Sequence, residues 1–256
     1  EKVLIVTNPD PDVSAVSMAI YDAAYKRSAR PVLVYQPVKT QLDFTEPAVV
    51  EAVRSNPDVF ISMSAEKLGK DEAAIQKPLM AGETPYNNTF HYLLDGLKSL
   101  RAFWSPSITA DLFAATVPVD YGKMKRECAA VSDLFSWADR VRVTNPKGTN
   151  ITFSLKGRTG MKDDGDFTLP GRGGNLPAGE GFVSPVVGTA EGVIVFDGSI
   201  SVYDGVLILE EPIEVLVRDG FVTEISGGVE ADEFRETIEK AQKKAKAQER
   251  KCYWPG

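Results

Sequence analysis

Short apolar runs alternate with helical patterns along the first 139 residues. Clusters of apolar residues between turn-forming residues predict buried strands at residues 2–7, 31–35, 58–63 and 101–104. Apolar positions at helical spacing predict helices over residues 14–26, 47–55 and 121–139, and a further helical stretch around His91. Strands and helices that alternate with short connections are typical of a mostly parallel sheet that carries helices on both faces.

The pattern changes near Arg140. Residues 140–144 and 150–155 alternate polar and apolar positions around an Asn-Pro-Lys-Gly turn, which predicts an antiparallel hairpin. Similar short strands and a polar helix follow, at residues 192–196, 206–209, 213–217, 221–225 and 230–251. We therefore predict an α/β protein with an open, mostly parallel sheet domain over residues 1–139, followed by a β-rich (α+β) domain over residues 140–256.

The charge and the cysteine content narrow the classes of function. The net charge is −7 and the isoelectric point is near 5.0, which argues against nucleic acid or an anionic membrane as partner. No apolar run reaches 18 residues, and the chain opens without a signal-peptide pattern. Two cysteines, Cys128 and Cys252, do not form a disulfide framework. We expect a cytoplasmic protein.

A glycine-rich segment is the strongest candidate for chemistry. Residues 171–180 hold four glycines, one proline and the polar residues Asn175 and Glu180. Glycine permits backbone conformations that other residues avoid, so we predict a tight, irregular loop that directs Asn175 and Glu180 to one point. A carboxylate there can bind a cation. A surface loop with a solvated Glu180 is the alternative.

Several segments together resemble one enzyme family. Their order and spacing are similar to the middle of the aminopeptidase T family of thermophilic metallo-aminopeptidases, at residues 145–153, 157–158, 175–180, 192–199, 211–213 and 220–222. The resemblance implies that Glu180 binds a metal in a two-metal site of Zn, Co or Mn. It also implies a peptide substrate, hydrolysis by a metal-activated water, and a homodimer.

Other features limit this interpretation. The remaining metal ligands of that family lie on later motifs, which this sequence does not contain, and His91 is its single histidine. We therefore expect the 256-residue chain to be inactive alone, with catalytic residues that the sequence does not identify. Asn175 and Arg158 are the expected substrate-binding residues, and Arg158 is also expected to orient Glu180.

Two other functions stay open. The chain can be a non-catalytic binding or assembly module of the same fold. It can also belong to a related branch of iron(II)-dependent ring-cleaving dioxygenases that act on dihydroxypyridine, since no residue present separates that branch from the peptidases. The cluster Asp163-Asp164-Gly165-Asp166 is interpreted as a solvated acidic turn rather than a calcium site. His91 is interpreted as structural, as are Asp10 and Asp12.

Overall fold

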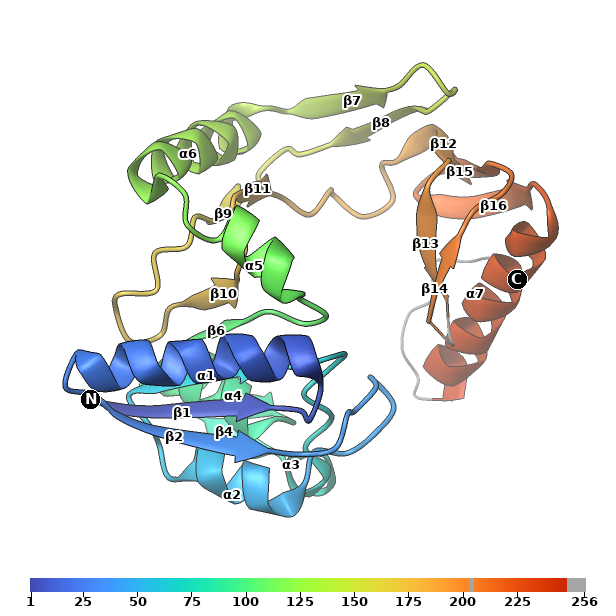
Figure 1. Ribbon diagram of the computed structural model, residues 1–256. Coiled ribbons are helices and arrows are strands. Elements are labelled where there is room, and N and C mark those ends of the chain that lie inside the picture. Colours follow the sequence, from blue (N-terminus) through green and yellow to red (C-terminus); the bar gives the residue numbers. More distant parts are fainter. Residues whose placement is uncertain (203–204, 248–256) are drawn as a thin grey trace. The chain divides into compact units, whose positions relative to one another are not determined.

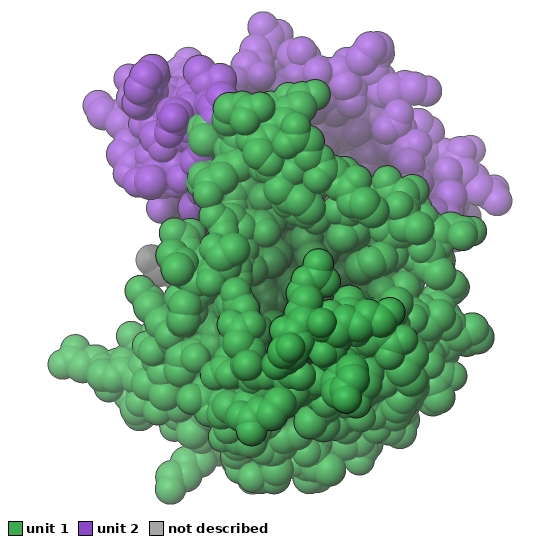
Figure 2. Space-filling view, turned by 60° about the vertical axis from the view of Figure 1, so that its left-hand side comes forward, with its two compact units in different colours: residues 1–129, 162–181 green, residues 130–161, 182–256 purple. Residues whose placement is uncertain are grey.

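The computed structural model describes residues 1–202 and 205–247, and these divide into two compact units (Figures 1 and 2). Unit 1 comprises residues 1–129 and 162–181, and unit 2 comprises residues 130–161 and the residues from 182 onward. The mixed α/β fold class is confirmed, with a parallel sheet in unit 1 and an antiparallel sheet in unit 2. The domain boundary at residue 140 stays a prediction.

Unit 1 is built on a five-stranded sheet in the order β10-β6-β3-β1-β2, and all of its recorded pairings are parallel. Four of the strands lie where the sequence predicts them: β1 (Lys2–Thr7), β2 (Arg30–Tyr35), β3 (Val59–Met63) and β6 (Arg101–Trp104). The fifth strand, β10 (Gly173–Asn175), lies inside the glycine-rich segment. The prediction of an irregular loop there was wrong for these three residues, because they pair with β6.

Helices cover both faces of this sheet (Figure 1). Val3 and Ile5 of β1 pack on the side of α1 (Pro11–Lys26) and α5 (Ala110–Thr116). Leu4 and Val6 point to the opposite side, as the alternation along a strand requires. That second core contains α2 (Pro47–Arg54), α4 (Thr89–His91) and the π-helix η1 (Tyr92–Gly96).

Helix α1 begins one turn earlier than the sequence indicates. Asp10, not Ser14, caps it: the Asp10 Oδ1 accepts hydrogen bonds from the backbone N–H of Asp12 at 3.0 Å and of Val13 at 3.2 Å. The Asp12 carboxylate in turn accepts a hydrogen bond from the Ala110 N–H at 3.0 Å, which ties α1 to the start of α5. Asp10 and Asp12 therefore have structural hydrogen bonds.

Asp71 connects the segments that follow β3. It caps α3 (Glu72–Gln76) through the Ala74 N–H at 2.9 Å, and it also accepts hydrogen bonds from the N–H and hydroxyl of Thr89 at 2.9 and 2.6 Å. Burial raises the pKa of this carboxyl, but the hydrogen bonds from Thr89 and Ala74 outweigh burial, and the pKa is lowered. The charged Asp71 therefore holds the start of α4. A short hairpin, β4 (Leu79–Ala81) with β5 (Thr84–Tyr86), lies between α3 and α4.

Unit 2 contains an antiparallel sheet in the order β16-β15-β12-β8-β7. Its strands are β7 (Arg140–Thr144), β8 (Asn150–Ser154), β12 (Glu191–Phe196), β15 (Ile213–Arg218) and β16 (Phe221–Ser226). Asp219 and Gly220 have φ values of 50° and 77°, which suit the tight turn between β15 and β16. Helix α7 (Val229–Ala247) packs on this core, where Phe234 meets Phe196 edge to face at 6.1 Å.

Helix α6 (Tyr121–Trp137) contains the point at which the chain passes from unit 1 to unit 2. The remaining strands form two pairs. These are β9 (Met161–Asp163) with β11 (Glu180–Phe182), and β13 (Ser199–Val202) with β14 (Gly205–Ile208). Cys128 is buried and free, whereas Cys252 lies outside the described residues. Within residues 1–202 and 205–247, each helix is too short or too polar to cross a membrane. The cytoplasmic location stays a prediction.

We expect Asp71→Asn to lower the free energy of unfolding by about 1–3 kcal/mol at pH 7, because it removes a charged, buried hydrogen-bond acceptor. Since the pKa of Asp71 is lowered in the folded protein, its stabilising effect is present above the ordinary aspartate pKa of about 3.9 and is lost as the pH falls through the folded value. The difference between the two proteins therefore shrinks below pH 4. Urea unfolding at pH 7, 4 and 3 measures it, with the exposed Asp22→Asn as control.

Candidate functional site

A cavity of about 440 Å³ opens in unit 1 at the carboxyl ends of three adjacent strands. Ser62 comes from β3, Trp104 from the end of β6, and Asn175 from the end of β10. Ligands of open parallel sheets bind at this edge. The other lining residues come from β3 itself, from α4 and the residue before it, and from the segments that follow β2, β3 and β6: Gln41, Phe60, Ser64, Lys67, Leu68, Gly69, Lys70, Asn88, Phe90, His91 and Pro106.

Aromatic side chains form one wall of the cavity. The rings of Phe60 and Phe90 have centroids 4.9 Å apart, and Phe90 meets Trp104 edge to face at 5.6 Å and 85°. Phe60 and Phe90 belong to the buried core, so this wall is fixed by packing. Such a wall offers a planar ligand ring the offset or edge-to-face contacts that aromatic pairs prefer.

Polar groups surround the aromatic wall. The hydroxyls of Ser62 and Ser64 lie 3.0 Å apart and are buried. Asn88 caps α4 by accepting a hydrogen bond from the Phe90 N–H at 2.9 Å. The His91 Nδ1 lies 2.9 Å from a carboxylate oxygen of Asp95, and about half of the imidazole is exposed. His91 thus has a structural partner and also lines the cavity.

The segment that follows β10 is tied to the end of β6. The Leu176 N–H donates to the Trp104 carbonyl at 3.1 Å, and the Ser105 hydroxyl donates to the Leu176 carbonyl at 2.5 Å. Ser105 is buried, with 2% of its surface exposed. It therefore positions the segment at the cavity edge, and the peptide bond from Leu176 to Pro177 is cis.

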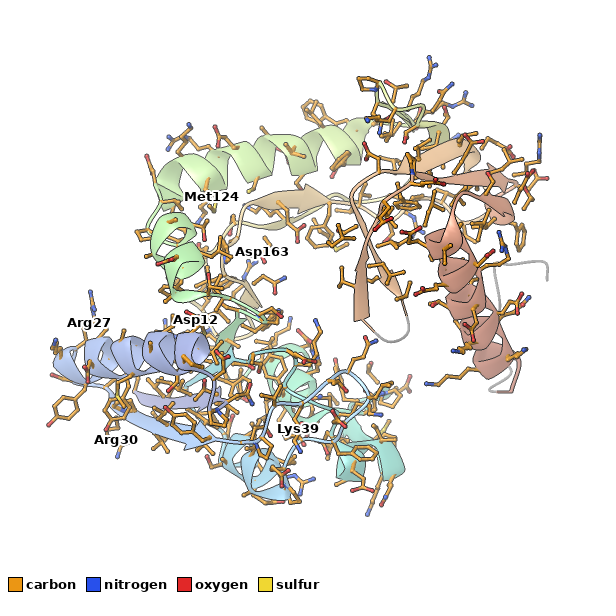
Figure 3. The ribbon with its side chains drawn as sticks, turned by 45° about the vertical axis from the view of Figure 1, so that its right-hand side comes forward. Asp12, Arg27, Arg30, Lys39, Met124 and Asp163 are labelled. Carbon is orange, nitrogen blue, oxygen red and sulfur yellow. The ribbon has the colours of Figure 1, made fainter. Side chains whose placement is uncertain are left out.

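Asp163 holds both ends of the same segment (Figure 3). Its Oδ2 accepts a hydrogen bond from the Asn175 N–H at 2.9 Å, and its backbone carbonyl accepts one from the Gly179 N–H at 3.0 Å. A methyl group at Gly174 would lie 2.5 Å from the Asp163 Oδ2, so only glycine permits this approach. The Met124 methyl group of α6 lies 3.4 Å from the position that a methyl group at Gly179 would take.

Asp163 has an unusual charge environment. Burial raises the pKa of its carboxyl, and the charges of Glu180 and Asp164 raise it further, whereas hydrogen bonds from Asn175 and Gly165 oppose the rise. The net effect is a raised pKa. Asp163 and Glu180 therefore influence each other through their charges, although Glu180 itself is exposed at the start of β11.

The three predicted site residues have different surroundings. Asn175 lines the cavity, and Glu180 is exposed and is not among the described lining residues. Arg158 donates a hydrogen bond to the Pro185 carbonyl at 2.8 Å within unit 2. The assignments of Glu180 to metal binding and of Asn175 and Arg158 to substrate binding stay predictions.

The rest of the acidic cluster is engaged by lysines. Asp164 lies 2.9 Å from the Lys162 Nζ, and Asp166 lies 2.5 Å from the Lys125 Nζ. The hydrogen bonds from Lys125 and Thr168 lower the pKa of Asp166. Asp163, by contrast, accepts a hydrogen bond from the backbone of β10, a role that was not predicted from the sequence. Its sequence surroundings, Asp163-Asp164-Gly165-Asp166, are those of an ordinary acidic turn.

A metal centre is not assembled by the described residues. In residues 1–202 and 205–247, no three His, Cys, Asp or Glu side chains lie together as a metal-binding group. Three or four protein ligands are the usual requirement for zinc. Asp163 and Glu180 are two carboxylates without a third partner in that part of the chain, so they do not fit a metal centre by themselves.

Gly174→Ala is expected to displace the Asp163 carboxylate and to break its hydrogen bond to the Asn175 N–H, because the added methyl group would lie 2.5 Å from Oδ2. We expect the free energy of unfolding to fall by about 1–3 kcal/mol. Gly198→Ala is the matched control, since no heavy atom lies within 4 Å of a methyl group there. Urea unfolding curves give both values, and equal stabilities of the two variants would contradict the expected result.

Glu180→Gln is expected to lower the pKa of Asp163, because it removes a nearby negative charge that raises that pKa. Titration of the Asp163 carboxyl by carbon NMR measures the change. Glu83→Gln, at an exposed turn of unit 1, is the control and leaves the pKa unchanged. An unchanged Asp163 pKa in the Glu180 variant would show that the two carboxylates do not interact.

Comparisons with known proteins give the chain a family. The family model described as NicX, 2,5-dihydroxypyridine 5,6-dioxygenase, matches residues 99–251, which is more than half of the chain. A solved structure of 2,5-dihydroxypyridine dioxygenase from Pseudomonas putida KT2440 superposes with a TM-score of 0.67 at 20% identity, over 93% of this chain. The chain spans 66% of the length of that structure. No curated protein matches the chain.

These findings correct the prediction from the sequence. The family is not aminopeptidase T, and a hydrolase, protease or metallo-aminopeptidase activity is not supported. Two Zn, Co or Mn ions per site are not supported either. The motifs behind the wrong prediction lie in turns and strands, such as the turn between β7 and β8 and the turn between β15 and β16, and such backbone features do not specify a reaction. The match over residues 99–251 establishes that the chain belongs to the NicX family, that of 2,5-dihydroxypyridine 5,6-dioxygenase.

Proposed function

We propose that this protein is a ring-cleaving dioxygenase that acts on a dihydroxylated pyridine. The observation that carries the proposal is the aromatic-walled cavity of unit 1, which receives Trp104 and Asn175 from the region that the family model matches. A single six-membered ring with its substituents fits a cavity of about 440 Å³. The alternative of a binding module without chemistry rests on the single histidine, whereas the family match favours the dioxygenase.

The side chains of the cavity bind and orient the ring. Phe60, Phe90 and Trp104 contact its faces and edges, and they exclude water from one side. The Asn175 amide and the Ser62 hydroxyl are the groups that bind ring hydroxyls, because both lie at strand ends beside the aromatic wall. Asp163 and Ser105 act indirectly, since their hydrogen bonds hold the Asn175–Leu176 backbone in place.

A ring-cleaving dioxygenase family implies a metal cofactor, and we propose that the metal is iron. Non-haem iron(II) oxygenases bind iron with two histidines and one carboxylate. His91 is the single histidine of these 256 residues, and the described residues do not gather three ligands. The described side chains therefore do not form an iron-binding site, and we assign no chemical step to the iron. The homodimer stays a prediction.

The test uses the protein expressed from its complete reading frame, reconstituted anaerobically with Fe(II). We expect it to consume oxygen and to remove the ultraviolet absorbance of 2,5-dihydroxypyridine, and we expect an iron chelator to stop both. Asn175→Ala is expected to raise KM about tenfold, which corresponds to one hydrogen bond of about 1.4 kcal/mol. Asn87→Ala, at an exposed position outside the cavity lining, is the matched control. No oxygen uptake with the dihydroxypyridine in the presence of Fe(II) would refute the proposal.

A further inference from the structure

Three residues on adjacent strands of unit 1 form a row along the cavity. The strand register places Ser62 of β3 opposite Trp104 of β6, and Trp104 opposite Asn175 of β10. Register partners on neighbouring strands carry their side chains on the same face of a sheet, and all three residues line the cavity. The row therefore offers a hydroxyl, an indole and an amide side by side, with the indole in the middle.

The row is long enough to bind opposite edges of one ring. Neighbouring strands lie about 4.8 Å apart, so two strand spacings separate the backbones of Ser62 and Asn175 by about 10 Å. Trp104 lies between them in the register and meets Phe90 edge to face at 5.6 Å. A six-membered ring that contacts Trp104 can therefore direct one substituent to the Ser62 hydroxyl and its opposite edge to the Asn175 amide.

The Asn175 side chain has no hydrogen-bond partner among the described residues, although its backbone is fixed. The Asn175 N–H donates to the Asp163 Oδ2 at 2.9 Å, and the Leu176 N–H donates to the Trp104 carbonyl at 3.1 Å. Asn175 is exposed, so its amide exchanges hydrogen bonds with solvent. A ligand can take over these hydrogen bonds without breaking one within the protein.

The other polar side chains of the lining offer a ligand less than Asn175 does. The Asn88 Oδ1 already accepts a backbone hydrogen bond at 2.9 Å, and the His91 Nδ1 already has a partner at 2.9 Å. The lysine ammonium groups of the lining can donate but cannot accept. Gln41 carries the same amide as Asn175, but it lies in a bend after β2 and not in a strand. Asn175 thus combines a free acceptor and free donors on a backbone that the sheet holds.

The ring of the proposed substrate has an edge that matches this amide. A pyridine with a hydroxyl at position 2 exchanges with its lactam tautomer, the 2-pyridone, which predominates in water. The lactam presents an N–H donor next to a carbonyl acceptor, and a side-chain amide presents a carbonyl acceptor next to an NH2 donor. The two groups form a cyclic pair of hydrogen bonds. A benzene-1,4-diol has a carbon in place of the ring nitrogen and leaves the amide carbonyl without a donor.

We propose that Asn175 is the residue that selects the ring nitrogen: its amide pairs with the lactam edge of the dihydroxypyridine, and the Ser62 hydroxyl contacts the oxygen on the opposite side of the ring. The pairing also orients the ring, because the reversed orientation places a C–H group against the amide carbonyl. This inference rests on the proposed function, since it names the specificity-determining residue of that same cavity.

The direct test is anaerobic calorimetric titration of the full chain, without added metal, with three matched compounds. 2,5-Dihydroxypyridine has the lactam edge. Benzene-1,4-diol has both oxygens without the ring nitrogen, and 5-hydroxy-1-methyl-2-pyridone keeps the carbonyl but carries a methyl group in place of the N–H. We expect the dihydroxypyridine to bind at least tenfold more tightly than either of the others, because each of them leaves the amide carbonyl unpaired.

An apolar substitution tests whether Asn175 makes this distinction. Asn175→Leu keeps the size of the side chain and removes both hydrogen bonds, so it is expected to raise the Kd of the dihydroxypyridine at least tenfold and to leave the Kd of the benzenediol within about twofold. Asn87→Leu, at an exposed position outside the cavity lining, is the matched control. Both variants should unfold at the same midpoint as the unchanged chain, which shows that the fold is kept.

Asn175→Asp tests the pairing by a change of preference that a damaged fold cannot imitate. A carboxylate accepts but does not donate, so it repels the lactam carbonyl. It matches the protonated form of 2-amino-5-hydroxypyridine, in which the ring N–H and the amino group donate side by side. At pH 6 we expect the unchanged chain to prefer the dihydroxypyridine and the variant to prefer the aminopyridine.

The outcomes separate this inference from the proposed function. Equal affinity for the dihydroxypyridine and the benzenediol, or no binding of either, overturns selection by Asn175 even if dihydroxypyridine supports oxygen uptake. Unchanged affinities in Asn175→Leu, or an unchanged preference in Asn175→Asp, overturn it as well. Tight, Asn175-dependent binding of the dihydroxypyridine without oxygen uptake in the presence of Fe(II) supports the pairing and refutes the dioxygenase.

Discussion

The hydrogen bond from the Asn175 N–H to the Asp163 carboxylate is the contact on which the site depends. It fixes the end of β10, a strand of only three residues at the sheet edge, and thereby sets where the Asn175 side chain enters the cavity. The carboxylate is half-buried and its pKa is raised, so keeping it charged costs free energy that this hydrogen bond partly offsets. Gly174 is required because any larger residue would occupy the space of the carboxylate.

The cavity combines an aromatic wall with lysine side chains. The packed rings of Phe60 and Phe90 give it a rigid apolar wall, which belongs to the same core that supports β1 and α2. Lys67 and Lys70 bring positive charge to its edge on a segment that Gly69 allows to pass close to Thr45. The hydrophobic core therefore determines the shape of the cavity, and a loop determines the charge at its edge. Because shape and charge depend on different segments, substitutions can change one without the other.

The family membership shows that a fold can be predicted correctly from a sequence while the reaction is predicted wrongly. Gly148 and Gly220 lie in turns at positive φ, a conformation that glycine adopts without strain, so they reflect the backbone rather than a reaction. They led to the right fold and the wrong reaction. A reaction is specified by side chains gathered in space, and only Asn175 of the three predicted site residues lies in the cavity.

The sequence by itself determined the elements whose signal is local. The alternation in β7 and β8, the apolar run of β1 and the helical spacing in α6 predicted those elements and the mixed α/β class, because each pattern repeats with the period of its own element. The tertiary structure decided what depends on distant residues. It made a strand of Gly173, Gly174 and Asn175 by pairing them with β6, and it brought Lys67, Trp104 and Asn175 to one cavity, since contacts across many residues leave no periodic trace in the chain.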